Sequence, residues 1–277
     1  AFDDHVHDAN TKGRKSPTHL IMDAWIKGIR RLTVIHYHFV RPETAAELLE
    51  AAAIMDMSVD LGIECLARHG EGHLKIVWTP RGFARPEDFT AFLKKPGVRD
   101  FMREGFELTL RQQRYVLALL DAFNARHRRT IREQFNLALE PLDPEEFLAF
   151  VGSGQASVLH LARYIHDCLL PLLNTQAAQT LDQTAPGKAC AYLAERDSLD
   201  VEALLDAYLS PAANPDILAP EATAPGETPP ERLTITAAAL TARIAELHYN
   251  NSLALCTAEM PLPDVLLTLF ACRGRIT

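Results

Sequence analysis

The sequence predicts an α/β fold with an all-helical insertion. Over the first hundred residues, segments rich in β-branched and aromatic residues alternate with segments whose apolar residues recur at helical spacing. Between residues 86 and 178 the strand-like segments stop and the helical spacing continues. Because a helix returns the chain to the start of the next strand, this alternation is typical of a parallel sheet or barrel. The chain is 48% hydrophobic and 23% charged, which indicates a globular protein.

The first predicted elements have clear start and stop signals. An extended segment covers residues 2–7, and the helix that follows has Ser16 as its N-cap and Pro17 as its first residue. That helix is expected to end at Gly28, a residue suited to the left-handed conformation beyond a helix terminus. The next elements predicted are a strand over 32–38, a helix from Pro42, a strand over 59–67 and a hairpin strand over 73–78.

The later part of the chain is predicted to be mainly helical. Helices are expected around residues 108–123, from Pro144, and over 157–170, where Pro171 should end the helix. Residues 211–231 are rich in proline, which is typical of a loop or a disordered segment. The last predicted elements are a helix over 234–247, a strand over 252–257, a helix over 264–271 and the start of a further strand at 275–277.

Charge and cysteine usage exclude several classes of function. The net charge is −8, and an acidic surface repels phosphates, so a broad nucleic-acid-binding surface is not expected. The five cysteines show no Cys-x-x-Cys spacing and are odd in number, so we expect reduced thiols and a cytoplasmic protein. No run of about 20 apolar residues predicts a membrane span, and no signal peptide is recognised.

The sequence His5-Val6-His7 is the sharpest candidate for a metal site. Histidines at positions i and i+2 of a strand point to the same face of the sheet. At the end of a barrel strand both imidazoles could reach one metal ion, and neutral imidazole is a suitable ligand for Zn, Mn or Fe. The alternative interpretation is a pair of partly exposed histidines near one end of the sequence.

Motifs spread along the chain resemble, in order, those of the polymerase-and-histidinol-phosphatase (PHP) superfamily. His5-Val6-His7, followed by Gly13 and Ser16-Pro17, is similar to the opening strand, loop and helix of that family. Leu61-Gly62-Ile63-Glu64 resembles the strand that carries a metal-bridging glutamate. The other segments with a resemblance are residues 28–35, His73-Leu74, residues 156–163 and residues 244–257.

The resemblance implies a distorted (β/α) barrel of the PHP type with an all-helical insertion. Residues 1–85 would form the first part of the barrel and residues 86–178 the insertion. Residues 179–277 would return to the barrel, with the proline-rich loop over 211–231. The family's last strand should follow residue 277, so we expect the last barrel strand or strands to be missing.

The resemblance also implies a metal-dependent phosphoesterase that hydrolyses a small phosphomonoester or a nucleotide. Its partner would be a small phosphorylated molecule and its cofactor a divalent Zn, Mn or Fe ion. The residues at positions of the family's metal ligands are His5, His7, Glu64 and His73. His160 and Arg114, both in the insertion, are the candidates for substrate binding. The alternatives are a locally packed helix histidine and an arginine on a solvated helix face.

Three positions depart from the family's ligand pattern. Lys12 stands in place of a ligand aspartate, Tyr37 in place of a ligand histidine, and Thr257-Ala258-Glu259 in place of Ala-His-Pro. At ~4 Å and an effective dielectric constant of ~20, exchanging Asp for Lys changes each interaction with a metal ion by several kcal/mol. We therefore expect fewer metal ions than is usual in the family. Glu259 is a further carboxylate that could face the site.

Two alternatives follow from these departures. His36 or His38 could substitute for the histidine that Tyr37 replaces, but adjacent strand residues face opposite sides, so the substitution requires a bulge. The second alternative concerns function: the chain would be a degenerate, non-catalytic PHP-like domain that acts as a regulatory or scaffold module of a longer protein.

Overall fold

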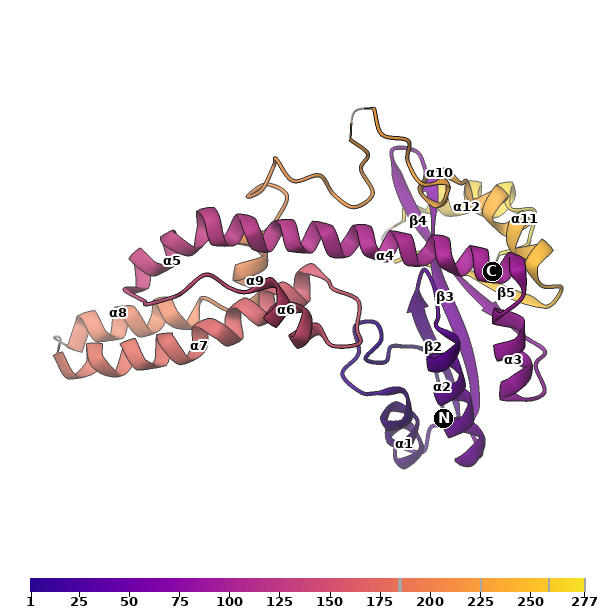
Figure 1. Cartoon of the computed structure of the whole chain (residues 1–277), viewed down its shortest axis with the longest axis horizontal. Coiled ribbons are helices and arrows are strands. Elements are labelled where there is room, and N and C mark those ends of the chain that lie inside the picture. Colours follow the sequence, from indigo (N-terminus) through magenta and orange to yellow (C-terminus); the bar gives the residue numbers. More distant parts are fainter. Residues whose placement is uncertain (184–185, 225, 259, 277) are drawn as a thin grey trace. The chain divides into compact units, whose positions relative to one another are not determined.

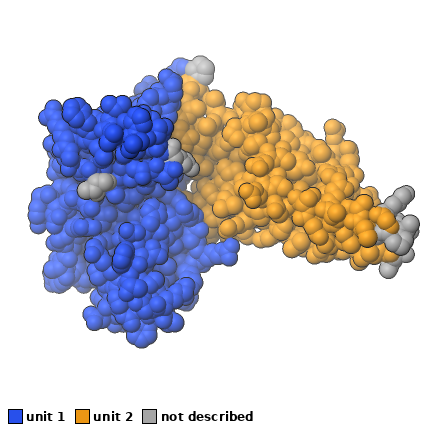
Figure 2. Space-filling model, turned by 180° about the vertical axis from the view of Figure 1, so that it is seen from behind, with its two compact units in different colours: residues 1–110, 225–277 blue, residues 111–224 orange. Residues whose placement is uncertain are grey.

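A computed structural model describes residues 1–183, 186–224, 226–258 and 260–276. The chain divides into two compact units, one formed by residues 1–110 and 225–277 and the other by residues 111–224 (Figure 2). The first unit contains a five-stranded sheet and helices, which confirms the mixed α/β class (Figure 1). The division into a barrel and an inserted helical region stays a prediction, because two compact units do not show which segment is the insertion.

The sheet of the first unit has the strand order β1-β2-β3-β4-β5. Strands β1, β2 and β3 are parallel, whereas β4 is antiparallel to both β3 and β5. The strand bounds are β1 Phe2–Val6, β2 Arg31–Tyr37, β3 Ser58–His69, β4 Gly72–Pro80 and β5 Asn251–Leu255. In this order β1 and β5 are the edge strands, so closure into a barrel stays a prediction.

The helices of the first unit begin largely where the sequence predicts. Ser16 caps the first helix, because its hydroxyl oxygen accepts a hydrogen bond from the His19 N–H. Thr236 caps another helix in the same way, by accepting from the Ala239 N–H. The helix bounds are α1 Pro17–Ile26, α2 Pro42–Ile54, α3 Pro86–Leu93, α4 Pro96–Ala122, α10 Glu231–Thr234, α11 Ala237–Leu247 and α12 Leu262–Ala271. Helix α4 begins in this unit and ends in the other.

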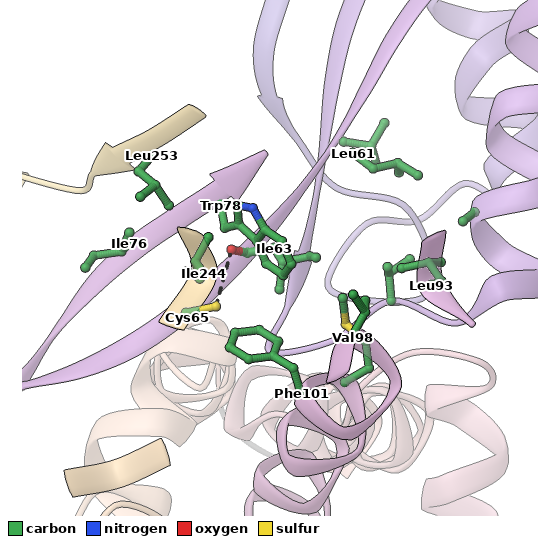
Figure 3. Packing of buried hydrophobic residues seen from close by; sticks show 14 of the residues in the cluster. Leu61, Ile63, Cys65, Ile76, Trp78, Leu93, Val98, Phe101, Ile244 and Leu253 are labelled. Atoms are coloured by element: carbon green, nitrogen blue, oxygen red, sulfur yellow. Dashed lines mark hydrogen bonds between the residues drawn. The ribbon is translucent and has the colours of Figure 1, made fainter. Parts of the chain in front are cut away.

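The main core lies on one face of the sheet, where alternate strand residues meet the helices (Figure 3). Ile63 and Cys65 of β3 and Trp78 of β4 are all fully buried there. The Trp78 ring makes an edge contact with Phe101 of α4, with ring centroids 5.2 Å apart. Fully burying side chains of this size contributes roughly 1.5–3 kcal/mol each, so this face sets the orientation of β2, β3 and β4.

The opposite face of the sheet is also tightly packed. A Cβ atom at Gly62 would lie 2.5 Å from the Cδ1 atom of Ile35 and 3.0 Å from the Cγ1 atom of Val77. Only glycine fits between these neighbours. Tyr37 and Glu64 come two residues after Ile35 and Gly62, so they lie on the same face of the sheet as this close contact.

The described residues of the second unit contain helices and no strand. Its core consists of apolar helix faces, with Phe123, Phe147 and Leu161 fully buried. Besides the end of α4, its helical segments are η1 Phe123–His127, α5 Arg128–Phe135, α6 Pro144–Val151, α7 Val158–Gln183, α8 Pro186–Asp197, α9 Val201–Leu204 and η2 Leu205–Leu209. The helical region therefore extends past residue 178, where the sequence places the end of the insertion.

The prediction that Pro171 ends a helix is wrong. Helix α7 continues through Pro171. A proline in a helix costs about 3 kcal/mol, but Leu169 and Leu173 on either side of it are fully buried in the core. Burial of two such side chains contributes roughly 3–6 kcal/mol, which offsets the proline. Tertiary packing thus overrides local propensity here.

The segment at the end of the sequence also differs from the prediction. Residues 275 and 276 are not in a strand, and Thr277 lies outside the described residues. The Arg275 N–H instead donates to the Cys272 carbonyl in a turn after α12. None of the helices in the described part of the chain combines the length and the apolar character needed to cross a membrane.

A buried guanidinium group packs against the core of the first unit. Arg232 in α10 is 1% exposed, and its guanidinium carbon lies 3.9 Å from the centroid of the Phe101 ring. None of its three side-chain nitrogens has a hydrogen-bond partner among the described residues. Removing a guanidinium group from water costs several kcal/mol, whereas a cation–π contact returns only about 2 kcal/mol.

We therefore expect Arg232→Met to raise the free energy of unfolding by about 1–3 kcal/mol, because an apolar side chain of similar length removes the desolvation cost. Urea denaturation measures the change. Arg243→Met is the matched control, since Arg243 also lies over Phe101 but donates to the Glu104 carboxylate at 2.7 Å. The control should lower stability by leaving Glu104 unpaired. A loss of stability in Arg232→Met would contradict the expectation.

Candidate functional site

The candidate site lies where β1 and β2 end. His5 and His7 come close together, with ring centroids 5.3 Å apart, and the His7 ring lies 5.0 Å from the ring of Tyr37. Tyr37 is the register partner of Glu64 on β3. Because register partners share one face of a sheet, Glu64 projects to the same side as Tyr37. The structure therefore brings three of the predicted ligands, His5, His7 and Glu64, to one side of the sheet.

The imidazole of His7 is held in one orientation. Its Nδ1 atom lies 2.9 Å from the carbonyl oxygen of Ile35, and a carbonyl only accepts, so Nδ1 carries the proton. The Nε2 atom is buried and has no hydrogen-bond partner among the described residues. Burial, together with the charges of Lys12 and His5, lowers the pKa of His7 to about 4. At neutral pH His7 thus presents a free lone pair on Nε2, as metal-binding histidines do.

Two lysines accompany the ligand-type residues. The Nζ atom of Lys12 lies 5.7 Å from the centroid of the Tyr37 ring, and its charge contributes to the low pKa of His7. The Nζ atom of Lys75 lies 3.7 Å from Oε1 of Glu64, a side chain that is 9% exposed. These cations oppose the accumulation of several divalent ions at the same place.

The loop after β1 is packed closely against the site. The Gly13 N–H donates to the Asp8 carbonyl at 2.9 Å, and the Thr11 hydroxyl donates to the same oxygen at 3.1 Å. A Cβ atom at Gly13 would lie 2.1 Å from the carbonyl oxygen of His7. The loop can therefore close over His7 only with glycine at this position.

Asp8 is a residue that the sequence reasoning missed. It is fully buried, and its Oδ2 atom lies 3.8 Å from Nε2 of His36. Its carboxylate accepts hydrogen bonds from the backbone N–H and the side-chain amide of Asn10. Its position directly after His7 was the available signal, but nothing in the sequence shows that Asp8 turns inward.

His36 does not reach the face that carries Tyr37. The ladder between β2 and β3 runs without interruption from Arg31 to Tyr37, so the bulge that the substitution requires is not present there. His36 therefore projects to the opposite face and is buried beside Asp8.

His38 lies just beyond β2 in the left-handed conformation, with φ 65°. Its N–H donates to the Glu64 carbonyl at 2.8 Å, while its Nδ1 atom is buried without a hydrogen-bond partner among the described residues. Burial, and then the charges of Arg232 and Lys75, lower the pKa of His38 to about 4. The charges of Arg232 and Lys75 therefore act on His38, which follows the end of β2.

The structure does not bring His73 to the other predicted ligands. His73 pairs with Arg68, four residues along the strand from Val77, which is the partner of Glu64. That separation is about 13 Å at the rise of a strand. The Nε2 atom of His73 lies 2.8 Å from the Leu233 carbonyl oxygen instead.

The two predicted substrate-binding residues belong to the second unit. His160 has its Nδ1 atom 3.1 Å from both the Ser157 hydroxyl and the Gln155 carbonyl, and Arg114 is exposed on α4. Their role in substrate binding stays a prediction. Glu259 lies outside the described residues.

As they stand, the donors are not assembled into a complete metal site. Among residues 1–183, 186–224, 226–258 and 260–276, no group of three or more His, Cys, Asp or Glu side chains is arranged to hold a metal ion. The arrangement offers an anchoring imidazole at His7, a second imidazole at His5, and a carboxylate at Glu64 that now pairs with Lys75.

The low pKa of His38 predicts that the metal-free protein becomes less stable as the pH is lowered. The folded pKa of about 4 lies below the value of about 6.5 in the unfolded chain, so the unfolded state binds more protons between these values. The free energy of unfolding should therefore fall by about 1–2 kcal/mol between pH 7 and pH 5 through this residue. Urea denaturation with a chelator present measures the slope. His38→Asn, which tolerates the left-handed conformation, should reduce it; an unchanged slope would contradict the prediction.

Gly13→Ala is expected to lower stability by about 2 kcal/mol or more and to displace His7, because the added Cβ overlaps the His7 carbonyl oxygen. Denaturation measures the first effect, and the nitrogen chemical shifts of the His7 ring report loss of the bond to Ile35. The matched control is Gly187→Ala in α8, where a Cβ meets nothing within 4 Å. If Gly13→Ala and the control behaved alike, the loop would not be constrained by this contact.

Comparison with known proteins identifies a shared fold. No protein-family model and no curated protein matches the sequence. Among solved structures, a protein named as a metal-dependent phosphoesterase from Bifidobacterium adolescentis is similar at 11% identity, with a TM-score of 0.57, over 98% of this chain and 74% of that one. An amidohydrolase from Chromobacterium violaceum, with bound sulfate and no metal, is similar at 12% identity, with a TM-score of 0.57, over 99% of this chain and 74% of that one. The chain therefore has a fold like that of these hydrolases.

Proposed function

We propose that this chain is a PHP-type domain and a metal-dependent phosphoesterase, which hydrolyses a small phosphomonoester or a nucleotide with one divalent ion. The observation that carries the proposal is the geometry of His7, whose Nδ1–H is tied to the Ile35 carbonyl while Nε2 is buried and free. The order of the PHP-like motifs and the fold shared with a protein named as a metal-dependent phosphoesterase support it. A closed barrel of the PHP type is part of the same proposal.

The chemistry of the donors fits a single Zn, Mn or Fe ion. His7 and His5 supply two imidazoles, and Glu64 supplies one carboxylate from the same side of the sheet. To complete the set, Glu64 has to exchange its contact with Lys75 for the ion. Because the Lys75 side chain is 57% exposed, water can solvate its ammonium group once the pair breaks, and the ion would replace it as the partner of the largely buried Glu64 carboxylate.

A divalent ion bound there supplies Lewis-acid chemistry at the phosphoryl group. The protein's own part is to position and neutralise the substrate. We propose that the ammonium groups of Lys12, near Tyr37, and of Lys75, beside Glu64, compensate the negative charge of the phosphate. The sulfate bound to the amidohydrolase of the same fold supports recognition of a tetrahedral anion. We propose His160 and Arg114 as additional substrate contacts.

A specific observation also favours a second candidate function. Lys12 and Lys75 stand beside His7 and Glu64, so each of these ligand-type residues already has a cationic neighbour. A site of this kind binds an anion without any metal ion. The chain would then be a non-catalytic PHP-like domain that serves as a regulatory or scaffold module.

Metal analysis of chelator-free protein distinguishes the two functions. We expect about one equivalent of Zn, Mn or Fe in the wild type and less than about 0.2 in His7→Ala, because His7 is the anchoring ligand. Lys12→Asp should raise the metal content toward about two equivalents by restoring an anionic ligand. Phosphatase activity toward a panel of phosphomonoesters should follow the metal content and vanish in His7→Ala.

The matched control is His19→Ala, because His19 is an exposed histidine on α1 whose ring bonds only Ser16 among the residues that the structure describes. Its metal content and activity should equal those of the wild type. If the wild type held less than about 0.2 equivalents and added Mn²⁺ produced no activity, the phosphoesterase would be rejected. Phosphate binding that is lost in Lys12→Ala would then support the non-catalytic domain.

A further inference from the structure

A cavity of about 330 Å³ lies in the first unit, at the end of the sheet opposite to His7 and Glu64. It is lined by the end of α2, by residues 58–61 where β3 begins, and by residues 80–86 between β4 and α3. Its volume is at the lower end of the range of small-molecule sites, roughly 300–1,000 Å³. The residues of the candidate metal site do not line it.

One wall of the cavity is apolar. Leu49, Ala53 and Met57 contribute from α2 and the turn after it. Phe83 and Phe89 contribute from the other side, and their rings make an edge contact with centroids 5.0 Å apart. These side chains offer the apolar and aromatic surface that binds the body of a small organic molecule.

The charges around the cavity leave one cation uncompensated. Arg85 donates to the Asp88 carboxylate at 3.1 Å, and Asp60 pairs with Arg31 at 3.5 Å. The guanidinium group of Arg81, by contrast, makes no hydrogen bond or ion pair with any residue in the described part of the chain. The balance of charge at the cavity therefore favours an anion that carries a single charge.

The backbone of Arg81 is fixed, although its side chain is free. Its N–H donates to the Asn250 carbonyl at 2.9 Å, and its carbonyl accepts from Nε2 of His248 at 2.7 Å. The His248 ring stacks on Phe83, with centroids 5.0 Å apart. Gly82 follows with φ 89°, where a Cβ would lie 2.9 Å from the Asn250 amide. Arg81 thus extends from a constrained turn at the rim of the cavity. Its backbone is already ordered, so binding has to order only the side chain.

We infer that this cavity binds a small organic carboxylate with an apolar body, whose carboxylate pairs with the Arg81 guanidinium while its body packs against Met57 and Phe83. A guanidinium group matches a carboxylate through two parallel hydrogen bonds. A phosphate monoester carries nearly two charges at neutral pH and is less well matched to one free cation. This site is independent of the proposed phosphoesterase function.

Isothermal titration of chelator-treated protein with 1-naphthoate tests the inference. We expect a Kd of about 0.1–1 mM for the wild type, and binding at least ~5-fold weaker for the neutral analogue 1-naphthamide. Arg81→Gln should weaken naphthoate binding by at least ~5-fold. Ala53→Trp should abolish it by filling the cavity from an exposed position on α2.

Matched controls separate a specific site from general effects. Arg99→Gln removes an exposed arginine of α4, and Ala178→Trp enlarges an exposed alanine of α7, so both should bind naphthoate like the wild type. His7→Ala should also bind it normally, because His7 does not line the cavity. No binding by the wild type, or equal binding by all the variants, would overturn the inference. Circular dichroism and thermal denaturation of each variant confirm that it is folded.

Discussion

The parallel register of β1, β2 and β3 is the constraint on which the rest of the site depends. Side chains alternate between the faces of a strand, so a shift by one residue would move every candidate ligand to the other side. The register is held by the apolar core on one face and by the close packing at Gly62 on the other. It places Glu64 beside Tyr37, and therefore on the side of His7, while His36 is turned toward Asp8.

The charge balance decides what this side of the sheet can bind. Lys12 replaces an anionic ligand of the PHP pattern, and its charge already acts on His7. A cluster of divalent ions would add several positive charges next to both lysines, at a cost of several kcal/mol for each close pair. A single ion is a different case, because Lys12 and Lys75 are both exposed and their charges are screened by water. The arrangement is therefore compatible with one ion and a phosphate, and opposes a cluster.

Local signals in the sequence predicted the mixed α/β class and the starts of several helices, but they do not reveal tertiary packing. The helix starts at Ser16-Pro17, Pro42 and Pro144 are marked by proline at the first helical position. Pro171 misled the prediction, because the burial of Leu169 and Leu173 on both sides cannot be read from composition. Whether the open sheet continues into a barrel depends on partners of the edge strands, which no local pattern identifies.

The candidate site was predictable only where it depends on strand periodicity. The i, i+2 spacing of His5 and His7 correctly placed both rings together. His73 lies apart from Glu64 along the hairpin of β3 and β4, because motif order does not reveal how far along a hairpin a residue lies; its role as a ligand stays a prediction.

The two ends of the sheet should bind their ligands independently. Coupling between two sites requires an element that can adopt two conformations. Each ligand must bind one of these conformations more tightly than the other. Strands β3 and β4 are shared by both ends, because Leu61 and Pro80 line the cavity, while Glu64 of β3 pairs with Lys75 of β4. Both strands are paired on both sides and their core residues are fully buried, so a second packing would be costly. We therefore expect a ligand at the Arg81 cavity to leave the affinity of the site near His7 unchanged.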